Sequence, residues 1–378
     1  MRSSLRLGTV KGLPIKIHIS FLFILPFFAL VFGFTFVPDL YGFRIGFGDL
    51  PIGWPEKLGL GLIAAVLFFA AVLLHELAHS MVALRRGYKI SGITLFIFGG
   101  ATEIEKQPKG AVGEGLMASV GPATSLIIGL VLLPFWLLLR DSTDLATTIV
   151  AIMFSMMSFY NILLAGFNII PAFPMDGGRV LRSFLAKRIG FIPATRTAVA
   201  VGKVIAVGMA IVGFFFNIWL ILIALFIYLG AKEEERSTLI GQALEGVTVG
   251  AIMTRDVSVV QPTTTVRELL DRIMLEKHMG YPVMDGGRVV GIVTLQDAQG
   301  VPALRHYDVE VSSIMSRDII AITPETPAEE AIQIMARQRV GRLLVMEEDR
   351  LVGIVSRSDV IRTLEIRSME QGMPLGRG

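Results

Sequence analysis

Long apolar tracts with almost no charge dominate the first 231 residues and constrain the fold more than any other feature. A helix needs about 20 such residues to cross the hydrocarbon core of a bilayer. Four tracts reach that length, at residues 17–37, 58–84, 116–139 and 145–170. A fifth, at 197–229, would be about 50 Å long as one helix, so we expect two spans that meet near residues 216–217. The sequence therefore predicts six spans, and the first tract is too long for a cleaved signal peptide.

Charge divides the chain into two parts. Residues 1–231 hold 18 Lys and Arg against 10 Asp and Glu, whereas residues 232–378 hold 17 against 22. This contrast excludes a wholly soluble protein and predicts a polytopic α-helical membrane domain of about six transmembrane helices, followed by a soluble α/β part. The basic excess lies in loops that flank the apolar tracts, so nucleic acid is not an expected partner, whereas membrane lipid is. Cys is absent, which excludes disulfides and thiolate metal sites.

The distribution of Lys and Arg between the apolar tracts predicts the orientation. The N-terminal segment and the loops at 85–114 and 171–196 together hold 14, whereas the other set of loops holds only Arg44, Lys57 and Arg140. Positive loops face the cytoplasm, so we expect a multi-pass protein of the cell membrane. Its N-terminus and its C-terminal part would both be cytoplasmic.

His75, Glu76 and His79 form the pattern HExxH within the second tract. Residues four apart lie on one face of a helix, so the two imidazoles can bind one zinc ion. Glu76 is placed to take a proton from a water that the zinc activates. Ionisable groups inside a span are costly unless they pair or bind something. A zinc site is therefore favoured over a coincidence of polar residues.

A catalytic zinc needs a third protein ligand and an open position for water. Asp176 is the best candidate, because two Pro and two Gly surround it in the segment NIIPAFPMDGGR, which ends the fourth tract. Irregular backbone at membrane depth is tolerated where it is buried or lines a wet cavity. Two alternatives stay open: Asp176 is only a solvated cap of a helix end, or His18 supplies the ligand.

These motifs resemble those of the site-2 protease family of intramembrane zinc metalloproteases. The matching segments are GLPIKIHIS (12–20), HELAH (75–79), FGGA (98–101), EGLMASVGP (114–122) and FNIIPAFPMDGGRV (167–180). The resemblance implies that His75, His79 and Asp176 bind one zinc ion and that Glu76 is the general base. It places Asn168 near the metal, where its amide would hold the substrate or the developing oxyanion.

Two further features concern the substrate. Residues 89–100 (KISGITLFIFGG) predict a short β-hairpin, similar to a segment that dips into the membrane in this family. Its edge could bind an unwound substrate helix as an added strand, and the alternative is a plain cytoplasmic hairpin. The candidate substrate-binding residues are Phe98, Gly99, Gly100 and Asn161. Asn161 precedes Asn168 by seven residues on the same helix face, and its alternative role is an interhelical hydrogen bond.

An internal repeat occupies the soluble part. VGAIMTRD at 249–256 matches VSSIMSRD at 311–318 at an offset of 62, and GIVTLQD at 291–297 matches GIVSRSD at 353–359. Each unit is expected to contain a helix, two strands and a helix. The expected strands are 281–284, 289–293, 343–346 and 351–355.

This repeat resembles a tandem pair of CBS domains, which often bind adenine nucleotides such as ATP, ADP or AMP. The resemblance implies that Asp297 and Asp359 contact ribose and that Thr294 and Ser356 contact phosphate. The alternatives are that these residues only cap helices and that the pair is a ligand-free protein-interaction module. A homodimer formed through the CBS domains is a further expectation.

We expect a zinc metalloprotease domain at 1–231, a linker at 232–246, CBS domains at 247–304 and 305–366, and a tail at 367–378. The expected function is endoproteolysis of transmembrane or membrane-associated proteins, with adenine nucleotide regulating activity through the CBS pair. The alternative is a CBS-regulated membrane cation transporter or channel, whose cation would bind His75, Glu76 and Asp176. A transport site, however, does not need two His four residues apart beside a base.

Overall fold

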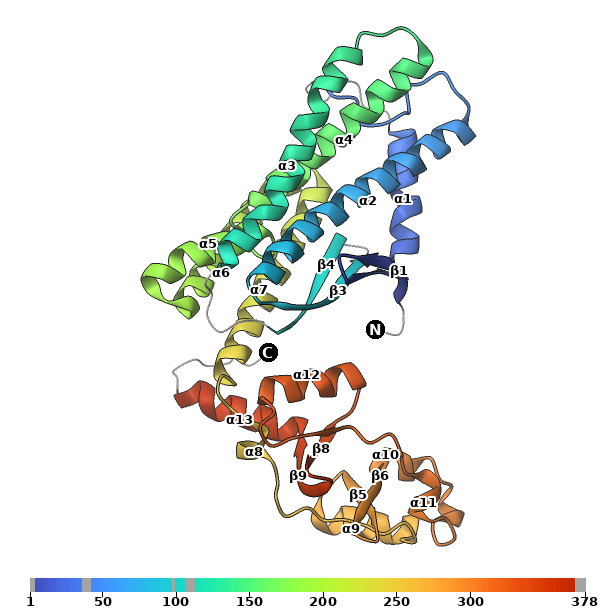
Figure 1. Cartoon of the computed structure of the whole chain (residues 1–378), viewed down its shortest axis with the longest axis vertical. Coiled ribbons are helices and arrows are strands. Elements are labelled where there is room, and N and C mark those ends of the chain that lie inside the picture. The colour runs from blue at the N-terminus through green and yellow to red at the C-terminus, as the bar shows by residue number, and fades with distance from the viewer. Residues whose placement is uncertain (1–3, 36–41, 97–98, 107–112, 371–378) are drawn as a thin grey trace. The chain divides into compact units, whose positions relative to one another are not determined.

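The computed structural model describes residues 4–35, 42–96, 99–106 and 113–370 (Figure 1). The chain divides into a unit at residues 1–236 and a second unit at residues 237–378. The first unit is mainly helical, and the second contains the paired repeats of short helices and strands.

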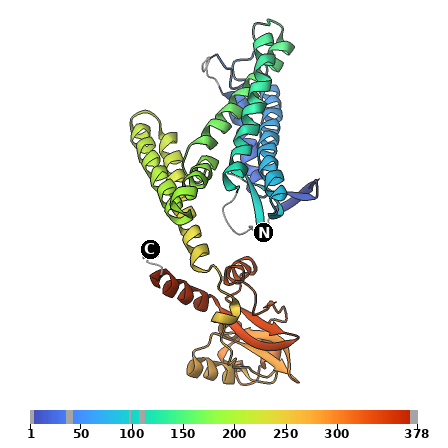
Figure 2. The same ribbon diagram turned by 60° about the vertical axis from the view of Figure 1, so that its left-hand side comes forward.

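Among the described residues, seven helices begin in the first unit, and the last of them extends into the second. They are α1 (Phe21–Phe34), α2 (Trp54–Arg85), α3 (Glu114–Leu139), α4 (Leu145–Ile169), α5 (Asp176–Ile189), α6 (Phe191–Phe216) and α7 (Ile218–Ala243). Figure 2 shows α1 to α4 as one group and α5 to α7 as a second. Among the described helices, α2, α3, α4 and α6 are long and apolar enough to cross a membrane, and α1 is apolar but shorter. The chain is therefore a membrane protein in its first unit, and the number of six spans stays a prediction.

Small residues let the helices of the first group approach one another closely. A Cβ atom on Gly61 of α2 would overlap the backbone of Ala29 in α1, and one on Gly129 of α3 would lie 2.9 Å from the carbonyl oxygen of Ser158 in α4. Close approach of this kind is the usual basis of helix packing within a bilayer. These two glycines thus allow α2 to pack closely against α1, and α3 against α4.

The expected break in the fifth tract is present. α6 ends at Phe216, Asn217 has an extended backbone, and α7 begins at Ile218. The side-chain oxygen of Asn217 accepts a hydrogen bond from the backbone N–H of Trp219, which satisfies a donor in the first turn of α7. α7 then continues to Ala243, so most of the segment expected to be a linker is helical.

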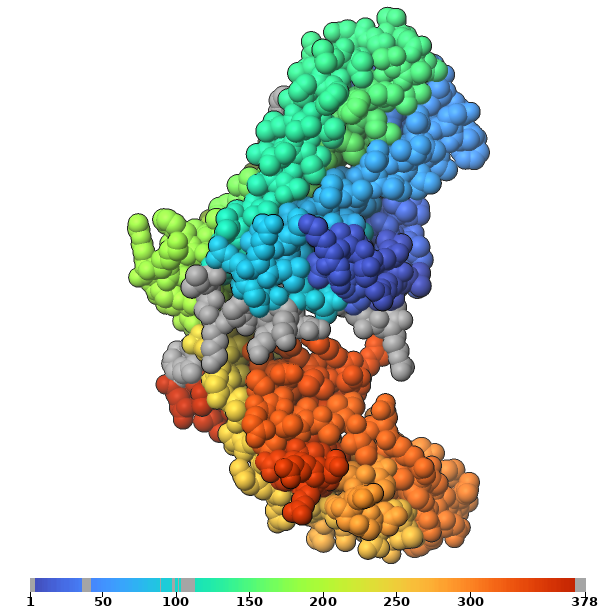
Figure 3. All heavy atoms as spheres, viewed as in Figure 1, coloured from blue at the N-terminus to red at the C-terminus, as the bar shows by residue number. Residues whose placement is uncertain are grey.

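A four-stranded sheet, which extends beyond the expected hairpin, lies beside the first helices (Figure 1). The space-filling view shows its dark blue N-terminal segment at the surface (Figure 3). Its strands are β1 (Ser4–Val10), β2 (Leu13–His18), β3 (Lys89–Phe96) and β4 (Gly99–Lys106), in that spatial order. The hairpin is therefore longer than predicted, and Gly99 and Gly100 begin its second strand instead of ending the motif. The first apolar tract also starts later than predicted, because its first residues pair with β1 and β3 in the sheet.

Helix α5 lies in a segment that the sequence predicted to be a loop. α5 begins at Asp176 and carries Arg182 on its buried side and Phe184 on its exposed side. Its sequence mixes apolar and basic residues and contains no uncharged tract of span length, so hydropathy did not indicate a helix here.

The second unit contains two similar halves. The first has α8 (Val249–Ile252), α9 (Val266–Glu276), β5 (Gly280–Asp285), β6 (Arg288–Thr294), α10 (Leu295–Gln299) and a 3₁₀ turn (Ala303–Arg305). The second has α11 (Val311–Ile314), β7 (Ala321–Ile322), α12 (Ala328–Gln338), β8 (Arg342–Glu347), β9 (Arg350–Ser356) and α13 (Arg357–Glu370). The four expected strands are all present, and each is one residue longer at both ends. The repeat seen in the sequence is thus a structural repeat of the CBS type.

Candidate active site

Helix α2 carries the three ionisable residues of the HExxH motif. His75 is buried, and Glu76 and His79 are partly buried. The two imidazole rings lie 4.8 Å apart, centre to centre, as expected for residues one helical turn apart on the same face. The motif therefore presents two imidazoles together inside the helix bundle.

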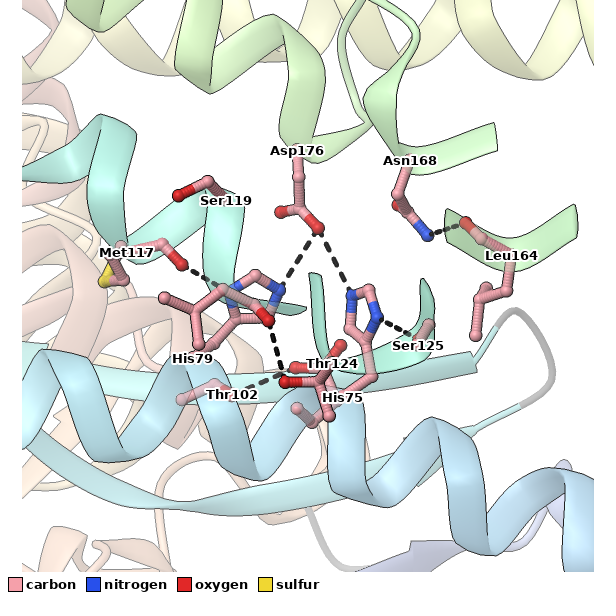
Figure 4. A network of polar contacts seen from close by, with 12 residues as sticks. His75, His79, Thr102, Met117, Ser119, Thr124, Ser125, Leu164, Asn168 and Asp176 are labelled. Atoms are coloured by element: carbon pink, nitrogen blue, oxygen red, sulfur yellow. Dashed lines mark hydrogen bonds and ion pairs between the residues drawn. The ribbon is translucent and has the colours of Figure 1, made fainter. Parts of the chain in front are cut away.

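Asp176 faces both rings from the other group of helices (Figure 4). Its Oδ2 atom lies 3.3 Å from Nε2 of His75 and 3.1 Å from Nε2 of His79. A tetrahedral zinc ion with bonds of about 2.1 Å separates neighbouring ligand atoms by about 3.4 Å. One carboxylate oxygen and two imidazole nitrogens at this spacing fit a zinc ion, and they are donors that zinc prefers.

Helix α3 orients both imidazoles through their other nitrogen. Nδ1 of His79 lies 2.6 Å from the carbonyl oxygen of Met117, and Nδ1 of His75 lies 2.9 Å from the hydroxyl of Ser125. A carbonyl only accepts, so Nδ1 of His79 donates its proton and the lone pair of Nε2 points toward Asp176. Such outer hydrogen bonds hold metal-binding histidines in the required tautomer.

Gly121 in α3 leaves the space in which the two rings meet. A Cβ atom at this position would overlap Nε2 of His79 and lie 2.6 Å from Nε2 of His75. A hydrogen in place of a side chain is therefore required for the donor atoms to converge on this side.

The backbone between α4 and α5 places Asp176. α4 ends at Ile169, and α5 starts at Asp176 itself. Gly177 and Gly178 pack directly against this connection, since a Cβ atom on Gly177 would overlap the carbonyl oxygen of Ile169. The Asp-Gly-Gly sequence thus lets the first turn of α5 lie close to the end of α4. Asp176 is neither a solvated cap nor remote from the histidines.

Strand β4 contacts the carboxylate of Glu76. The hydroxyl of Thr102 donates to Oε2 of Glu76 at 3.1 Å and also lies 3.1 Å from the hydroxyl of Ser80. A Cβ atom on Gly100 would overlap Cγ of Glu76. Gly100 and Thr102, two residues apart and so on one face of the strand, both lie against Glu76.

The other candidates occupy different positions. Asn168 lies near the end of α4, close to the cluster in Figure 4, and its amide donates to the carbonyl of Leu164 at 2.9 Å. Asn161 is fully buried and donates to the carbonyl of Met157, and its own carbonyl has no partner among the described residues. Nδ1 of His18 lies 2.8 Å from the hydroxyl of Ser20, and His18 is not part of the three-residue cluster.

Gly99 has a positive φ of 126° and open space where a Cβ atom would lie. Phe98 falls outside the described residues.

In the second unit, both Asp residues of the repeated motif cap helices. Oδ2 of Asp297 accepts from the backbone N–H and the hydroxyl of Thr294 at 2.8 and 2.7 Å. Asp359 accepts from Ser356 in the same way at 2.8 and 2.6 Å. The capping role is therefore present at both sites, and it uses one oxygen of each carboxylate.

A cavity of about 610 Å³ opens beside the first of these caps. Thr294 and Asp297 line it together with Arg339 and Arg342 from the other repeat. Nη1 of Arg342 donates to the carbonyl oxygen of Gly280 at 2.7 Å, and burial lowers the pKa of Arg342. Neither arginine was predicted from the sequence, because both fall outside the repeated motif.

Four residues around the zinc-type cluster were missed as well, namely Thr102, Met117, Gly121 and Ser125. Met117 and Gly121 belong to the matching segment EGLMASVGP, which was used only as a mark of resemblance. Thr102 and Ser125 carry no signal in a single sequence, because their roles depend on contacts between distant elements.

Comparison with known proteins places the two units in known families. Residues 63–141 and 139–212 match the model of peptidase family M50, and residues 249–300 and 311–366 match that of the CBS domain.

Relatives extend over the whole chain. A zinc metalloprotease of Methanocaldococcus jannaschii is 32% identical over 98% of this chain and 99% of its own length. A Mycobacterium tuberculosis protein named as the zinc metalloprotease Rip3 is 32% identical over 99% of this chain and 96% of its own length. The solved site-2 protease from M. jannaschii is 36% identical, covering 62% of this chain and 95% of its own, with a TM-score of 0.42.

The similarity to the M. jannaschii zinc metalloprotease extends through both units of this chain. This chain therefore belongs to the site-2 protease family of zinc metalloproteases, peptidase family M50, and carries a CBS domain pair in its second unit.

Proposed function

We propose that this zinc metalloprotease cleaves transmembrane or membrane-associated proteins within the bilayer. The observation that carries the proposal is the approach of one Asp176 oxygen to Nε2 of both His75 and His79. These histidines lie on α2, a helix long and apolar enough to span a membrane. Hydrolysis at this position would act on peptide bonds that reach the lipid phase.

His75, His79 and Asp176 would hold the zinc ion, which lowers the pKa of a bound water toward neutrality. Glu76 accepts the proton of the attacking water and later gives it to the leaving amine. Its carboxylate is oriented for this by the hydroxyl of Thr102. The second amide N–H of Asn168 can donate to the oxyanion that develops on the scissile carbonyl.

The experiment is cleavage of a fluorogenic transmembrane peptide by the purified full chain in detergent. We expect Glu76→Gln to keep its zinc and to lose roughly 10²- to 10⁴-fold in rate, the usual contribution of a general base. Glu56→Gln, the same substitution in the first turn of α2, is the matched control and should retain the wild-type rate. Cleavage by Glu76→Gln at the wild-type rate would refute the proposal. Membrane peptides that accumulate in cells carrying this variant would identify the substrate.

We also propose that β4 receives the unwound substrate as an added strand. β4 is the last strand in the sheet order β1-β2-β3-β4, and Gly100 and Thr102 on this strand contact Glu76. A peptide paired with β4 would therefore run beside the base. Exchange of Gly99 for Pro should weaken cleavage by raising KM, because Pro changes the backbone at the start of the strand.

A second proposal concerns the CBS pair, which would bind an adenine nucleotide and regulate cleavage. The cavity of about 610 Å³ has the size of a small-ligand site. Asp297 would contact ribose and Thr294 phosphate, with Asp359 and Ser356 as their counterparts. Arg339 and Arg342, which also line the cavity, add positive charge suited to phosphate.

Calorimetric titration of ATP, ADP and AMP into the full chain tests this proposal, with cleavage measured in parallel. Binding should be weakened by Asp297→Ala, and saturation should change cleavage by roughly 5- to 150-fold, the usual range of coupling between two sites. Asp285→Ala, which alters a strand end with no part in the motif, is the control. Absence of binding at millimolar nucleotide would leave the CBS pair as a protein-interaction module.

The proposed setting is a cell membrane, crossed several times, with the N-terminus and CBS pair in the cytoplasm. Lys and Arg are concentrated in the loops that would then be cytoplasmic, where adenine nucleotides are available. A homodimer through the CBS domains is also proposed, and light scattering of the purified chain tests it.

A further inference from the structure

A buried ion cluster joins helices α3, α5 and α7 and has no part in the chemistry described so far. Its centre is Arg182 of α5, which is 5% exposed. The guanidinium donates to both carboxylate oxygens of Glu114 in the first turn of α3, and to Oε1 of Glu234 in α7 at 2.8 Å. The rings of Phe173 and Phe191 each lie 4.9 Å from it.

We propose that Arg182 is a positioning residue for the third zinc ligand, and that Glu234 makes the position of this ligand depend on helix α7. The proposal rests on the proposed function in one respect: Asp176 has to be a zinc ligand. It concerns residues that do not touch the metal and act only through Asp176.

The cluster joins the two elements whose relative position defines the site. Arg182 follows Asp176 by six residues in the same helix, or about 9 Å along its axis. Glu114 precedes Met117, whose carbonyl orients His79, by about one turn of α3. A pair of hydrogen bonds from the planar guanidinium to one carboxylate fixes angle as well as distance. The Arg182–Glu114 pair therefore sets where Asp176 meets the histidines.

Glu234 adds a third element to this arrangement. It lies on α7, which continues beyond it to Ala243. Ala243 and Leu244 are buried in the core of the second repeat, together with Met335 and Leu343. Ala243 is the last residue of α7, so the helix that contacts Arg182 ends within the second unit. Movement of α7 would reach Asp176 through Arg182.

The next residue of α7 provides a matched control. Nζ of Lys203 in α6 lies 3.1 Å from Oε2 of Glu235, so this pair joins α7 to α6. Among the described residues it forms no ion pair with α5. If the loss of either ion pair of α7 were enough to weaken zinc binding, Glu235→Gln would lower zinc affinity as much as Glu234→Gln does. If the ion pair affects zinc binding through Arg182, only Glu234→Gln will lower zinc affinity.

The experiment measures zinc affinity of the full chain by competition with a chromophoric chelator, which does not depend on cleavage. Arg182→Lys keeps the charge but loses the planar fork, and we expect it to weaken zinc binding roughly 10- to 100-fold, the range seen when partners of metal ligands are changed. Glu234→Gln should weaken it roughly 10-fold, and Glu235→Gln should leave it unchanged. Elution as a single species and an unaltered circular dichroism spectrum show that each variant folds.

Two further measurements separate positioning from general stability. In chains saturated with Co²⁺, the absorption bands of Arg182→Lys should shift, because they report the geometry of the ligands and not the fraction folded. In the same Co²⁺-saturated chains, Glu234→Gln should also shift the bands and Glu235→Gln should leave them in place, because Glu234 contacts Arg182 whereas Glu235 contacts Lys203.

Three results would overturn the inference: equal zinc affinity in all variants, equal losses in Glu234→Gln and Glu235→Gln, or Co²⁺ bands of Arg182→Lys at the wild-type positions. Each of these results can be obtained while the wild-type chain binds zinc and cleaves peptide. Absence of zinc or cleavage in the wild type would instead refute the proposed function.

Discussion

Oδ2 of Asp176 lies 3.1 Å from Nε2 of His79, although 97 residues separate the two in the chain. The contact joins α2, which carries both histidines, to α5, which starts at Asp176. Helix α2 alone therefore sets the spacing of the two imidazole donors. The position of the carboxylate donor depends on how α5 packs against α3. This division determines which substitutions should abolish zinc binding and which should only weaken catalysis.

Removing the carboxylate of Asp176 should abolish stable zinc binding. Two imidazoles alone hold zinc poorly, because a catalytic site uses three protein ligands. We expect zinc measured by atomic absorption to fall from about one ion per chain to near zero in dialysed Asp176→Ala. His18→Ala is the control, since the ring contacts Ser20 instead. The reverse outcome, with zinc lost only from His18→Ala, would show that the third ligand is misassigned.

A methyl group at Gly121 should disturb the metal site more than the fold. It would overlap Nε2 of His79, and the ring, held at Nδ1 by Met117, would have to turn away. Zinc affinity in Gly121→Ala should fall by roughly 100-fold, the upper end of the range for disturbed metal-ligand orientation. In Gly208→Ala of α6, where a Cβ atom meets nothing within 4 Å, zinc affinity should stay at the wild-type level. Equal affinities in the two variants would contradict the geometry.

Loss of the Thr102 hydroxyl should lower the rate of cleavage without changing zinc binding. Thr102→Val keeps the shape of the side chain and removes the hydrogen bond to Oε2 of Glu76. We expect kcat to fall about tenfold, which corresponds to about 1.4 kcal/mol, with zinc content unchanged. Thr102→Ser restores the hydroxyl and should recover most of the rate. Equal rates in Thr102→Val and Thr102→Ser would mean that Glu76 functions without this hydrogen bond.

The orientation can be tested by reporter fusions. A reporter joined after Arg140, in the turn between α3 and α4, should be found outside the cytoplasm, and one joined after Lys232 should be cytoplasmic. The reason is the excess of Lys and Arg in the loops expected to be inside. A reporter after Arg86, in the same set of loops as the N-terminus, serves as the internal reference. Opposite locations would overturn the assignment of six spans.

Local patterns in the sequence were sufficient for most helices and for the repeats. An uncharged tract of span length has to satisfy its backbone hydrogen bonds internally, so it forms a helix whatever surrounds it. The spacing of His75 and His79 follows from one turn of such a helix. The break at Asn217 followed from length alone, and the strands of the CBS pair followed from short β-branched runs repeated at an offset of 62.

Contacts between distant segments decided the rest. β2 reads as the lead into an apolar tract, and only its parallel pairing with β3, at Ile15 and Ile93, makes it part of a sheet. α5 has too much charge to be found as a span, and its buried Arg182 is stabilised by Glu114 and Glu234 from two other helices.

The sequence by itself determined that a membrane helix would present two histidines and a glutamate on nearby faces, because helical spacing is a property of the local backbone. Which oxygen completes the site, which hydroxyl holds Glu76 and which glycine leaves room for the rings were decided only by tertiary structure. Asp176, Thr102 and Gly121 come from three different elements, and no local rule relates them to α2. Their convergence exists only once these elements are packed together.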